Sequence, residues 1–313
     1  MKIQEQVSLK DKNWFGTGGA ARYFCEPATA QDFKDALIFA KKHKLEIFVL
    51  GEGANIVVSD DGFDGLVICP QTTNPIINEK TGLVTASAGI HMNDLIEKTV
   101  AHNLTGLEIF SDIPGTIGGS VYINLHYFEA LISKFLINGE IINIKTGEVK
   151  TVDNKWFEFG YDNSKLMEKK YYLVNATLQL KPSTDIETAF AKGRRFEIIR
   201  HRRSRYPKGK TCGSFFRNFH DHEVSFIYEG KKMPFIAYYL DKIGVKGTEK
   251  VGDVQVSSQH ANMLVNNGQG TSSDIVTLAR VLQEKVKKQF GIVPKPECIF
   301  VGFKEYPLLT PQS

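Results

Sequence analysis

The sequence Ser111-Asp112-Ile113-Pro114-Gly115-Thr116-Ile117-Gly118-Gly119-Ser120 places a proline and three glycines within ten residues. Glycine permits positive φ and lets a ligand approach the backbone closely, and consecutive N–H groups in such turns form concave anion sites. A second turn, Leu50-Gly51-Glu52-Gly53-Ala54-Asn55, directly follows a predicted strand at 47–50. Two loops of this kind are suited to hold a pyrophosphate between them, whereas a Gly-x-Gly turn by itself is more often only a tight turn.

The turn at Gly51 matches neither of two common nucleotide-binding patterns. A dinucleotide-binding fingerprint needs a third glycine and a following helix, but the residues from Ile56 read as a strand. A P-loop needs Gly-Lys followed by Ser or Thr, and that sequence does not occur at this turn. The pattern therefore excludes a Rossmann-type site and a P-loop here.

Helices and strands are predicted on both sides of these loops. Thr29 and Asp32 are a predicted capping box for a helix with apolar residues at helical spacing, and Asn93 is the predicted cap of a short helix. A long amphipathic helix is expected at 186–203 and another from Thr271 or Ser272 to Gly291. Strands are predicted from the apolar runs at 84–88, 139–144, 174–180 and 298–303.

Length and composition indicate a globular protein of more than one domain. A chain of 313 residues is long for one hydrophobic core, and its 42% hydrophobic and 24% charged residues are ordinary values. The four cysteines are far apart and form no Cys-x-x-Cys pair, which argues against a zinc site or disulfide framework and suits a reducing compartment. The N-terminus lacks the apolar core of a signal peptide. We therefore expect a cytoplasmic protein with no metal site and no membrane insertion.

The formal net charge of +4 is mild, and basic residues are densest at 194–210. This stretch is either a site for a phosphate or carboxylate, or a solvated helix face. A nucleic-acid partner is not expected, because the aromatic residues are scattered and form no stacking pattern there.

Six ordered motifs, running from near residue 13 to near residue 302, make the chain similar to the UDP-N-acetylenolpyruvoylglucosamine reductases. The motifs are Asn13-Trp14-Phe15-Gly16-Thr17-Gly18-Gly19, Gly51–Asn55, Leu107–Ser120, Gly213-Ser214-Phe215-Phe216-Arg217-Asn218, a block with Gly252, Gln255-Val256-Ser257 and His260-Ala261-Asn262, and Pro296-Glu297. Six motifs in order are far more specific than any one of them. The chain looks like the shorter subtype of that family.

The resemblance implies an α+β fold of the vanillyl-alcohol-oxidase type. It implies one FAD-binding subdomain at 1–69, to which 299–313 returns, a second at 70–200, and a C-terminal α+β substrate domain at 201–298. It also implies the reaction, in which NADPH reduces FAD and a hydride then passes to UDP-N-acetylglucosamine enolpyruvate. The product is UDP-N-acetylmuramate for peptidoglycan synthesis. We expect a monomer whose partner is this nucleotide-sugar substrate.

The resemblance further implies roles for individual residues. Ser214 matches the proton donor, and Glu297 matches the acid that assists at the substrate carboxylate. Asn218, Gln255 and Arg202 are the implied substrate contacts. The implied FAD contacts all come from the two glycine loops and are Gly51, Glu52, Gly53, Ala54, Asn55, Ile56, Ser111, Asp112, Pro114, Gly115, Thr116, Gly118, Gly119 and Ser120.

Three segments depart from the family pattern. The family usually has an arginine after the tyrosine of a Tyr-Arg-x-Ser motif, but this chain has Asp162 there. Bulky residues at 125–129 stand where small ones are usual, and Gly16 replaces a common arginine. Because Asp162 reverses a charge expected beside the substrate carboxylate, two alternatives stay open. One is an FAD oxidoreductase with a different substrate, and the other is a catalytically weak paralogue that binds a nucleotide sugar or a partner.

Overall fold

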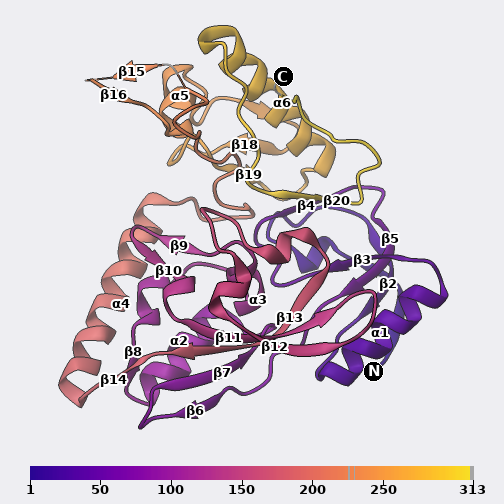
Figure 1. Cartoon of the computed structure of the whole chain (residues 1–313). Helices are drawn as coiled ribbons and strands as arrows, with labels where there is room; N and C mark the ends of the chain where they lie inside the picture. Colours follow the sequence, from indigo (N-terminus) through magenta and orange to yellow (C-terminus); the bar gives the residue numbers. More distant parts are fainter. Residues whose placement is uncertain (225, 229, 311–313) are drawn as a thin grey trace. The chain divides into compact units, whose positions relative to one another are not determined.

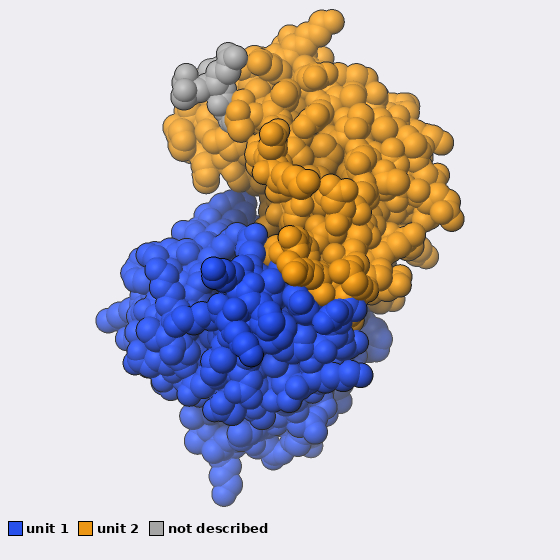
Figure 2. Space-filling view, turned by 90° about the vertical axis from the view of Figure 1, so that its right-hand side faces the viewer, with its two compact units in different colours: residues 1–5, 23–52, 65–202 blue, residues 6–22, 53–64, 203–313 orange. Residues whose placement is uncertain are grey.

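The computed structural model describes residues 1–224, 226–228 and 230–310. The chain divides into two compact units, each assembled from segments that are distant in the sequence (Figure 2). Unit 1 comprises residues 1–5, 23–52 and 65–202, and unit 2 comprises residues 6–22, 53–64 and 203–313. The finer division into segments 1–69, 70–200, 201–298 and 299–313 stays a prediction.

Unit 1 contains an antiparallel sheet with the strand order β12-β11-β13-β7-β6 (Figure 1). Its strands are β6 (Ile76–Asn78), β7 (Leu83–Ser87), β11 (Leu136–Asn143), β12 (Val149–Asp153) and β13 (Tyr171–Gln179). The helices α2 (Met92–Ala101) and α3 (Ile117–Tyr122) place apolar side chains in the same buried cluster as β7, β11 and β13. Three of the predicted strands are thereby confirmed.

The helix α1 (Ala30–Lys42) begins with the predicted capping box, which is confirmed. The Thr29 hydroxyl accepts from the Asp32 N–H at 3.1 Å, and the Asp32 carboxylate accepts from the Thr29 N–H at 3.1 Å. The apolar face of α1 packs with strand β5 in one buried cluster. Strand β5 belongs to a sheet with the order β1-β2-β5-β3, made of β1 (Ile3–Ser8), β2 (Ala20–Cys25), β5 (Phe63–Ile68) and β3 (Glu46–Val49).

In unit 2, helix α6 (Ser272–Phe290) packs on a small antiparallel sheet with the order β17-β18-β19. The sheet consists of β17 (Lys250–Val251), β18 (Val254–Val256) and β19 (Leu264–Asn266), and α5 (Ile236–Lys242) joins the same core. The predicted ends of α6 are confirmed, with Thr271 as the N-cap and Gly291 at φ 73° as the C-cap. The Asp60 carboxylate stabilises the N-terminal end of α6, because it accepts hydrogen bonds from the Ser272 N–H at 2.9 Å and the Ser273 N–H at 2.8 Å.

The last strand, β20 (Ile299–Val301), pairs in parallel with β4 (Ile56–Val58) inside unit 2. Both strands are thus close to sequence motifs, since β4 follows the glycine turn at Gly51 and β20 follows Pro296-Glu297. The Ile299 N–H donates to the Asn55 carbonyl at 3.0 Å, which aligns the two segments. Two segments that are distant in the sequence therefore meet at these motifs.

The helix α4 (Asp185–Arg205) confirms the helix predicted at 186–203, but not its amphipathic character, because Thr188 and Ala191 are its buried residues and Ile186, Phe190 and Phe196 are exposed. Its arginines form ion pairs within unit 1, namely Arg194 with Glu108, Arg195 with Glu97 and Arg200 with Glu197. The remaining short elements are β8 (Leu104–Thr105), β9 (His126–Tyr127), β10 (Ala130–Leu131), β14 (Lys181–Pro182), β15 (Ile227–Tyr228), β16 (Lys231–Lys232) and the 3₁₀ helices Lys10–Lys12, Leu107–Phe110, Ile132–Lys134, Asn154–Phe157 and Lys165–Glu168. Among the described residues, no helix is both long and apolar enough to span a membrane.

Two local predictions are wrong. The N-cap of α2 is His91, not Asn93. The Asn93 side chain instead binds the glycine loop, since its Oδ1 accepts from the Asp112 N–H at 2.8 Å and its Nδ2 donates to the Ile113 carbonyl at 3.2 Å. The stretch Ser111–Ser120 is also not all loop, because Ile117–Tyr122 forms α3 with Thr116 as its N-cap. An asparagine near the start of a helix can either cap that helix or bind a distant loop, and the sequence does not distinguish these two roles.

Candidate active site

The glycine loop at 111–116 is fixed by backbone hydrogen bonds to the ends of β7 and α2. The Met92 N–H donates to the Gly115 carbonyl at 2.9 Å, the Ile117 N–H to Ile90 at 2.9 Å, and the Gly118 N–H to Ala88 at 2.8 Å. A Cβ on Gly118 would lie 3.0 Å from the Ala88 carbonyl oxygen, so this close approach favours glycine. The loop is therefore rigidly mounted on the sheet of unit 1.

Gly115 presents open backbone at the centre of this loop. Its φ is +135°, a conformation available essentially to glycine, and apart from its two chain neighbours no described residue has a heavy atom within 4 Å of a Cβ built on it. Its N–H donates to the Glu52 carboxylate at 2.6 Å, and the same carboxylate lies 3.1 Å from His91 Nδ1. A Cβ on Gly51 would lie 2.7 Å from the Thr116 hydroxyl. The two predicted loops thus meet in unit 1, and His91, to which no sequence pattern pointed, joins them there.

The other half of the first glycine turn lies in unit 2. Gly53 has φ +67°, and a Cβ there would lie 2.3 Å from the Lys12 carbonyl oxygen. Its own carbonyl accepts from the Trp14 N–H at 3.0 Å, which joins this turn to the motif at 13–19. Asn55 donates weakly to the Glu297 carbonyl at 3.4 Å, while its Oδ1 is buried without a hydrogen-bond partner in the described part of the chain. An unsatisfied buried acceptor is costly unless a ligand donates to it.

Ser214 and Glu297 lie on neighbouring extended segments in unit 2. The Glu297 N–H donates to the Phe215 carbonyl at 2.8 Å, and the Arg217 N–H donates to Lys295 at 3.0 Å. On its other side, Ser214 forms an isolated bridge with Met263. The serine loop is therefore held between two of the motifs that the sequence singled out.

The side chains of these two segments differ in their exposure to solvent. Phe215 and Cys298 are buried at 0% and 5% exposure, whereas Ser214 is half-buried and Glu297 is exposed. Burial raises the pKa of the nearby Cys212 thiol, and a hydrogen bond with the Cys298 thiol is the second cause of this rise. Cys212 is therefore a neutral thiol at physiological pH and not a nucleophile. Ser214 and Glu297 are therefore accessible polar groups on these two segments.

Asn262 holds the serine loop through both of its side-chain groups. Its Oδ1 accepts from the Phe216 N–H at 3.0 Å, and its Nδ2 donates to the Phe216 carbonyl at 2.7 Å. The Asn262 N–H donates to His260 Nδ1 at 3.2 Å. Burial and the charge of Arg205 lower the pKa of His260, which suits a neutral ring that accepts this hydrogen bond. His260 therefore has a supporting contact with the serine loop.

Glu223 links the serine loop to the C-terminal motif, and the sequence pattern did not identify it. Its carboxylate accepts two hydrogen bonds from the Arg217 guanidinium, both at 2.7 Å, and one from the Lys295 ammonium at 2.7 Å. Arg217 is three residues after Ser214, and Lys295 is two residues before Glu297. One carboxylate thus ties together the chain segments that carry both candidate catalytic residues.

The predicted substrate contacts have polar partners in the chain. Asn218 Oδ1 accepts from the Ile236 N–H at 3.3 Å, and Gln255 Nε2 donates to the Gly247 carbonyl at 2.8 Å. Arg202 donates to the Asp112 carbonyl at 3.3 Å, and its guanidinium lies over the Tyr127 ring at 5.4 Å from the centroid. Arg202 thus contacts the glycine loop of unit 1. No group of three or more metal-ligating side chains occurs among the residues that the structure describes.

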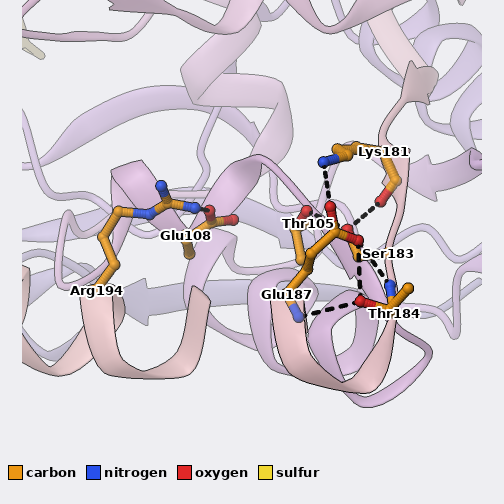
Figure 3. A network of polar contacts seen from close by, with 7 residues as sticks. All are labelled: Thr105, Glu108, Lys181, Ser183, Thr184, Glu187 and Arg194. Atoms are coloured by element: carbon orange, nitrogen blue, oxygen red, sulfur yellow. Dashed lines mark hydrogen bonds and ion pairs between the residues drawn. The ribbon is translucent and has the colours of Figure 1, made fainter. Parts of the chain in front are cut away.

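Glu108, at the start of the longest motif, anchors the glycine loop through a polar network with helix α4 (Figure 3). Its carboxylate is almost fully buried and binds the Arg194 guanidinium and the Gly106 N–H. Its carbonyl accepts from the Ser111 hydroxyl at 2.7 Å. In a separate set of contacts, Thr184 and Glu187 exchange hydrogen bonds at the start of α4. Glu108 therefore has a structural role.

Arg194→Met is expected to lower the free energy of unfolding by about 1–3 kcal/mol, because it leaves the buried Glu108 carboxylate without its cation. Arg200→Met is the matched control on the same helix. Arg200 pairs with Glu197, and both side chains are about 70% exposed, at 73% and 67%, so the loss should be only about 0.2–0.5 kcal/mol. Urea denaturation of both variants measures the difference, and equal losses would contradict the assigned role of Glu108.

Comparison with known proteins identifies the family. The UDP-N-acetylenolpyruvoylglucosamine reductase of Gloeobacter violaceus is 32% identical over 302 residues, which covers 96% of this chain and 97% of the relative. The relative of the same name from Protochlamydia amoebophila is 32% identical over 308 residues, covering 97% and 96%. The chain belongs to the UDP-N-acetylenolpyruvoylglucosamine reductase family.

Family models and a solved structure agree with this membership. Residues 204–301 match the model described as the C-terminal domain of this family, and residues 21–153 match an FAD binding domain. The crystal structure of the reductase from Thermus caldophilus superposes with a TM-score of 0.77 at 25% identity, covering 96% of this chain and 99% of that one. The predicted resemblance and the α+β fold with an FAD-binding domain and a C-terminal domain are confirmed.

Proposed function

We propose that this chain is an FAD-dependent UDP-N-acetylmuramate dehydrogenase of peptidoglycan synthesis. It reduces the enolpyruvyl group of UDP-N-acetylglucosamine enolpyruvate and uses NADPH as the electron source in the cytoplasm. The observation that carries the proposal is the hydrogen bond of 2.8 Å from the Glu297 N–H to the Phe215 carbonyl. It holds the two candidate acids, Ser214 and Glu297, on adjacent segments of extended backbone. Family membership supplies the substrate.

The residues present fit FAD. Gly115 offers open backbone at positive φ in a loop mounted on the sheet of unit 1. Separately, Asn55 has a buried Oδ1 that lacks a donor among the described residues. The open space beside Gly115 admits a cofactor, and the Asn55 Oδ1 can accept a hydrogen bond from one of the N–H or O–H groups of FAD. We assign its binding to the glycine loops at 51–56 and 111–120.

When bound, FAD supplies redox chemistry by carrying two electrons from NADPH to the substrate. The protein's residues handle the charge and the proton. Addition of hydride to the terminal vinyl carbon places negative charge on the carbon beside the carboxylate. Ser214 donates a proton to that carbon, and Glu297 assists at the carboxylate side. Both steps together reduce the C=C bond and add one hydride and one proton.

The substrate contacts follow from the same proposal. Asn218 and Gln255 are assigned to the nucleotide sugar in unit 2, and Arg202, which also contacts the glycine loop, is assigned to an anionic group. Arginine suits phosphate and carboxylate because its planar fork donates to both oxygens.

The test uses the purified full-length protein under anaerobic conditions. We expect a visible flavin spectrum, loss of its colour with NADPH, and its return when UDP-N-acetylglucosamine enolpyruvate is added. NADH serves as the comparison reductant and should react more slowly. A colourless protein that does not bind added FAD would contradict the flavoenzyme. A flavin that is reduced by NADPH but not reoxidised by this substrate would favour a different substrate.

A further inference from the structure

The glycine loop at 111–116 donates one of its N–H groups to a carboxylate of the chain itself. The Gly115 N–H donates to Glu52 Oε2 at 2.6 Å. Both residues belong to unit 1, and the Glu52 side chain is 23% exposed. An acidic side chain that solvent can reach therefore occupies the backbone donor at the centre of a loop assigned to the cofactor.

Other N–H groups of the stretch 111–120 donate to neutral acceptors that belong to the fold. These acceptors are backbone carbonyls or the side chains of Asn93 and Thr116. The donors are the N–H groups of Ser111, Asp112, Ile113, Ile117, Gly118, Gly119 and Ser120. A backbone carbonyl leaves its donor only when the fold opens locally, whereas a carboxylate leaves by rotation of its own side chain. Gly115 therefore carries a donor that an incoming anion can reach by displacing one side chain.

The Gly115 backbone is held independently of Glu52. Its carbonyl accepts from the Met92 N–H at 2.9 Å. Apart from its two chain neighbours, no described residue has a heavy atom within 4 Å of a Cβ built on Gly115. The donor thus keeps its place when the carboxylate moves, and the space beside it is open.

The Glu52 backbone is anchored on a different part of unit 1. The Leu50 N–H donates to the Ile68 carbonyl at 2.8 Å, which fixes the chain just before the glycine turn. The oxygen that accepts from Gly115 also lies 3.1 Å from His91 Nδ1. The Glu52 side chain therefore links the segment that ends at residue 52 to the segment at 91–115.

A carboxylate oxygen and a phosphate oxygen are equivalent partners for a backbone N–H, since both are charged acceptors. FAD contains a diphosphate, and its oxygens need donors of this kind. One N–H cannot serve two anions fully, and two like charges at that distance repel each other. A phosphate oxygen can therefore bind the Gly115 N–H only after the Glu52 carboxylate has left it.

We propose that Glu52 competes with the diphosphate of FAD for the Gly115 N–H. This inference rests on the proposed function, because the assignment of FAD to the glycine loop comes from there. The resemblance implied that Glu52 is a cofactor contact, and the inference gives its side chain the opposite effect. The carboxylate holds two segments of unit 1 together and lowers the affinity for FAD.

The test is a fluorescence titration of the full chain, stripped of flavin, with FAD. Glu52→Ala is expected to tighten FAD binding by about 5- to 50-fold, because apparent affinity falls with the fraction of molecules whose donor is taken. The same substitution should lower the thermal midpoint of the stripped chain by about 2–4 °C, because a link between two segments is lost. These effects have opposite directions, so a general loosening of the fold does not produce both.

Glu52→Gln is the second variant, and it removes the charge while keeping an acceptor of the same shape. Its gain in FAD affinity should be smaller than that of Glu52→Ala, because the amide oxygen still accepts from Gly115. Riboflavin, which lacks the diphosphate, should bind each variant within about twofold of wild type.

Glu79→Gln is the matched control, because the Glu79 carboxylate also contacts a histidine ring of unit 1, that of His102, at 2.6 Å. It removes the same charge and should leave the Kd of FAD unchanged. An equal gain in this control would overturn the inference, since overall charge would then explain the effect.

Unchanged or weaker FAD binding by Glu52→Ala would also overturn the inference, and so would an equal gain for FAD and riboflavin. If Glu52→Ala does not fold, Glu52→Gln decides by the same criteria. These outcomes leave the proposed function intact. A wild-type chain that does not bind FAD would instead contradict the proposed function, and the inference with it.

Discussion

Ser214→Ala is expected to lower kcat by about 10²- to 10⁴-fold, the range that a positioned general acid contributes. The loss should fall on the step that uses the enolpyruvyl substrate. Reduction of the flavin by NADPH should keep its wild-type rate, because that step requires no proton from Ser214. Stopped-flow measurement of the two half-reactions separates these effects. The substitution removes only a half-buried hydroxyl, so the fold should be unaffected.

The control for this experiment is Ser258→Ala, an exposed serine in the same unit. It should leave both half-reactions unchanged. Substrate affinity is the second readout, because a proton donor acts in the transition state and its loss lowers kcat with little change in KM. Turnover of Ser214→Ala within about threefold of wild type would remove Ser214 as the proton donor.

Local signals in the sequence predicted the elements whose ends are set by local chemistry. The capping box at Thr29, the N-cap Thr271 and the C-cap Gly291 are examples, because each satisfies backbone groups of its own helix. Asn93 was misassigned because its side chain bonds to a loop about twenty residues away. A local pattern cannot distinguish a cap from a tertiary contact made by the same residue type.

The candidate site was predictable where it consists of backbone loops and not where it depends on paired side chains. Glycine and proline spacing indicated a loop at 111–120, of which 111–116 is loop with Gly115 at φ +135°, while α3 begins at Ile117. The pairing of His126 with Asp162 joins residues 36 positions apart. In the sequence, each appeared separately as a departure from the family pattern. Their proximity becomes visible only when the fold brings the two side chains within 3.0 Å.

Glu223 shows the same limit in unit 2, and it supports the second large prediction. Its carboxylate binds both Arg217 and Lys295, with a side-chain exposure of 15%. Glu223→Gln removes the negative charge and leaves two cations next to each other. We expect the free energy of unfolding to fall by about 2–3 kcal/mol, the range for a partly buried hydrogen bond to a charged group. Urea denaturation at neutral pH measures this loss.

The same variant should lower kcat while its flavin content is unchanged. Glu223 is a positioning residue, since it acts through the segments that carry Ser214 and Glu297 and belongs to unit 2. A purely structural residue would alter stability without moving kcat at a temperature where the protein is fully folded. A variant with lower stability but wild-type kcat would therefore contradict the positioning role.

The pH dependence of stability gives an independent check on Glu223. The hydrogen bonds from Arg217 hold the pKa of the Glu223 carboxyl well below its usual value. Burial acts in the opposite direction and raises this pKa, whereas the hydrogen bond from Lys295 lowers it further. The depressed pKa means that the unfolded chain takes up a proton before the folded chain does. The stabilisation is thus complete above the unfolded pKa of about 4.3 and is lost as the pH falls toward the folded value. The stability difference between wild type and Glu223→Gln should accordingly be constant from about pH 8 to 6 and shrink below about pH 4.

Glu168→Gln is the control for this pH series. The hydrogen bond from Lys170 also lowers the pKa of Glu168, but that pair is exposed to solvent. Exposed pairs contribute little because water screens them, so its stability should follow wild type at every pH. A difference for Glu223→Gln that persists unchanged into acid would mean that the hydrogen-bonding shape of the side chain, and not its charge, holds Arg217 and Lys295 together.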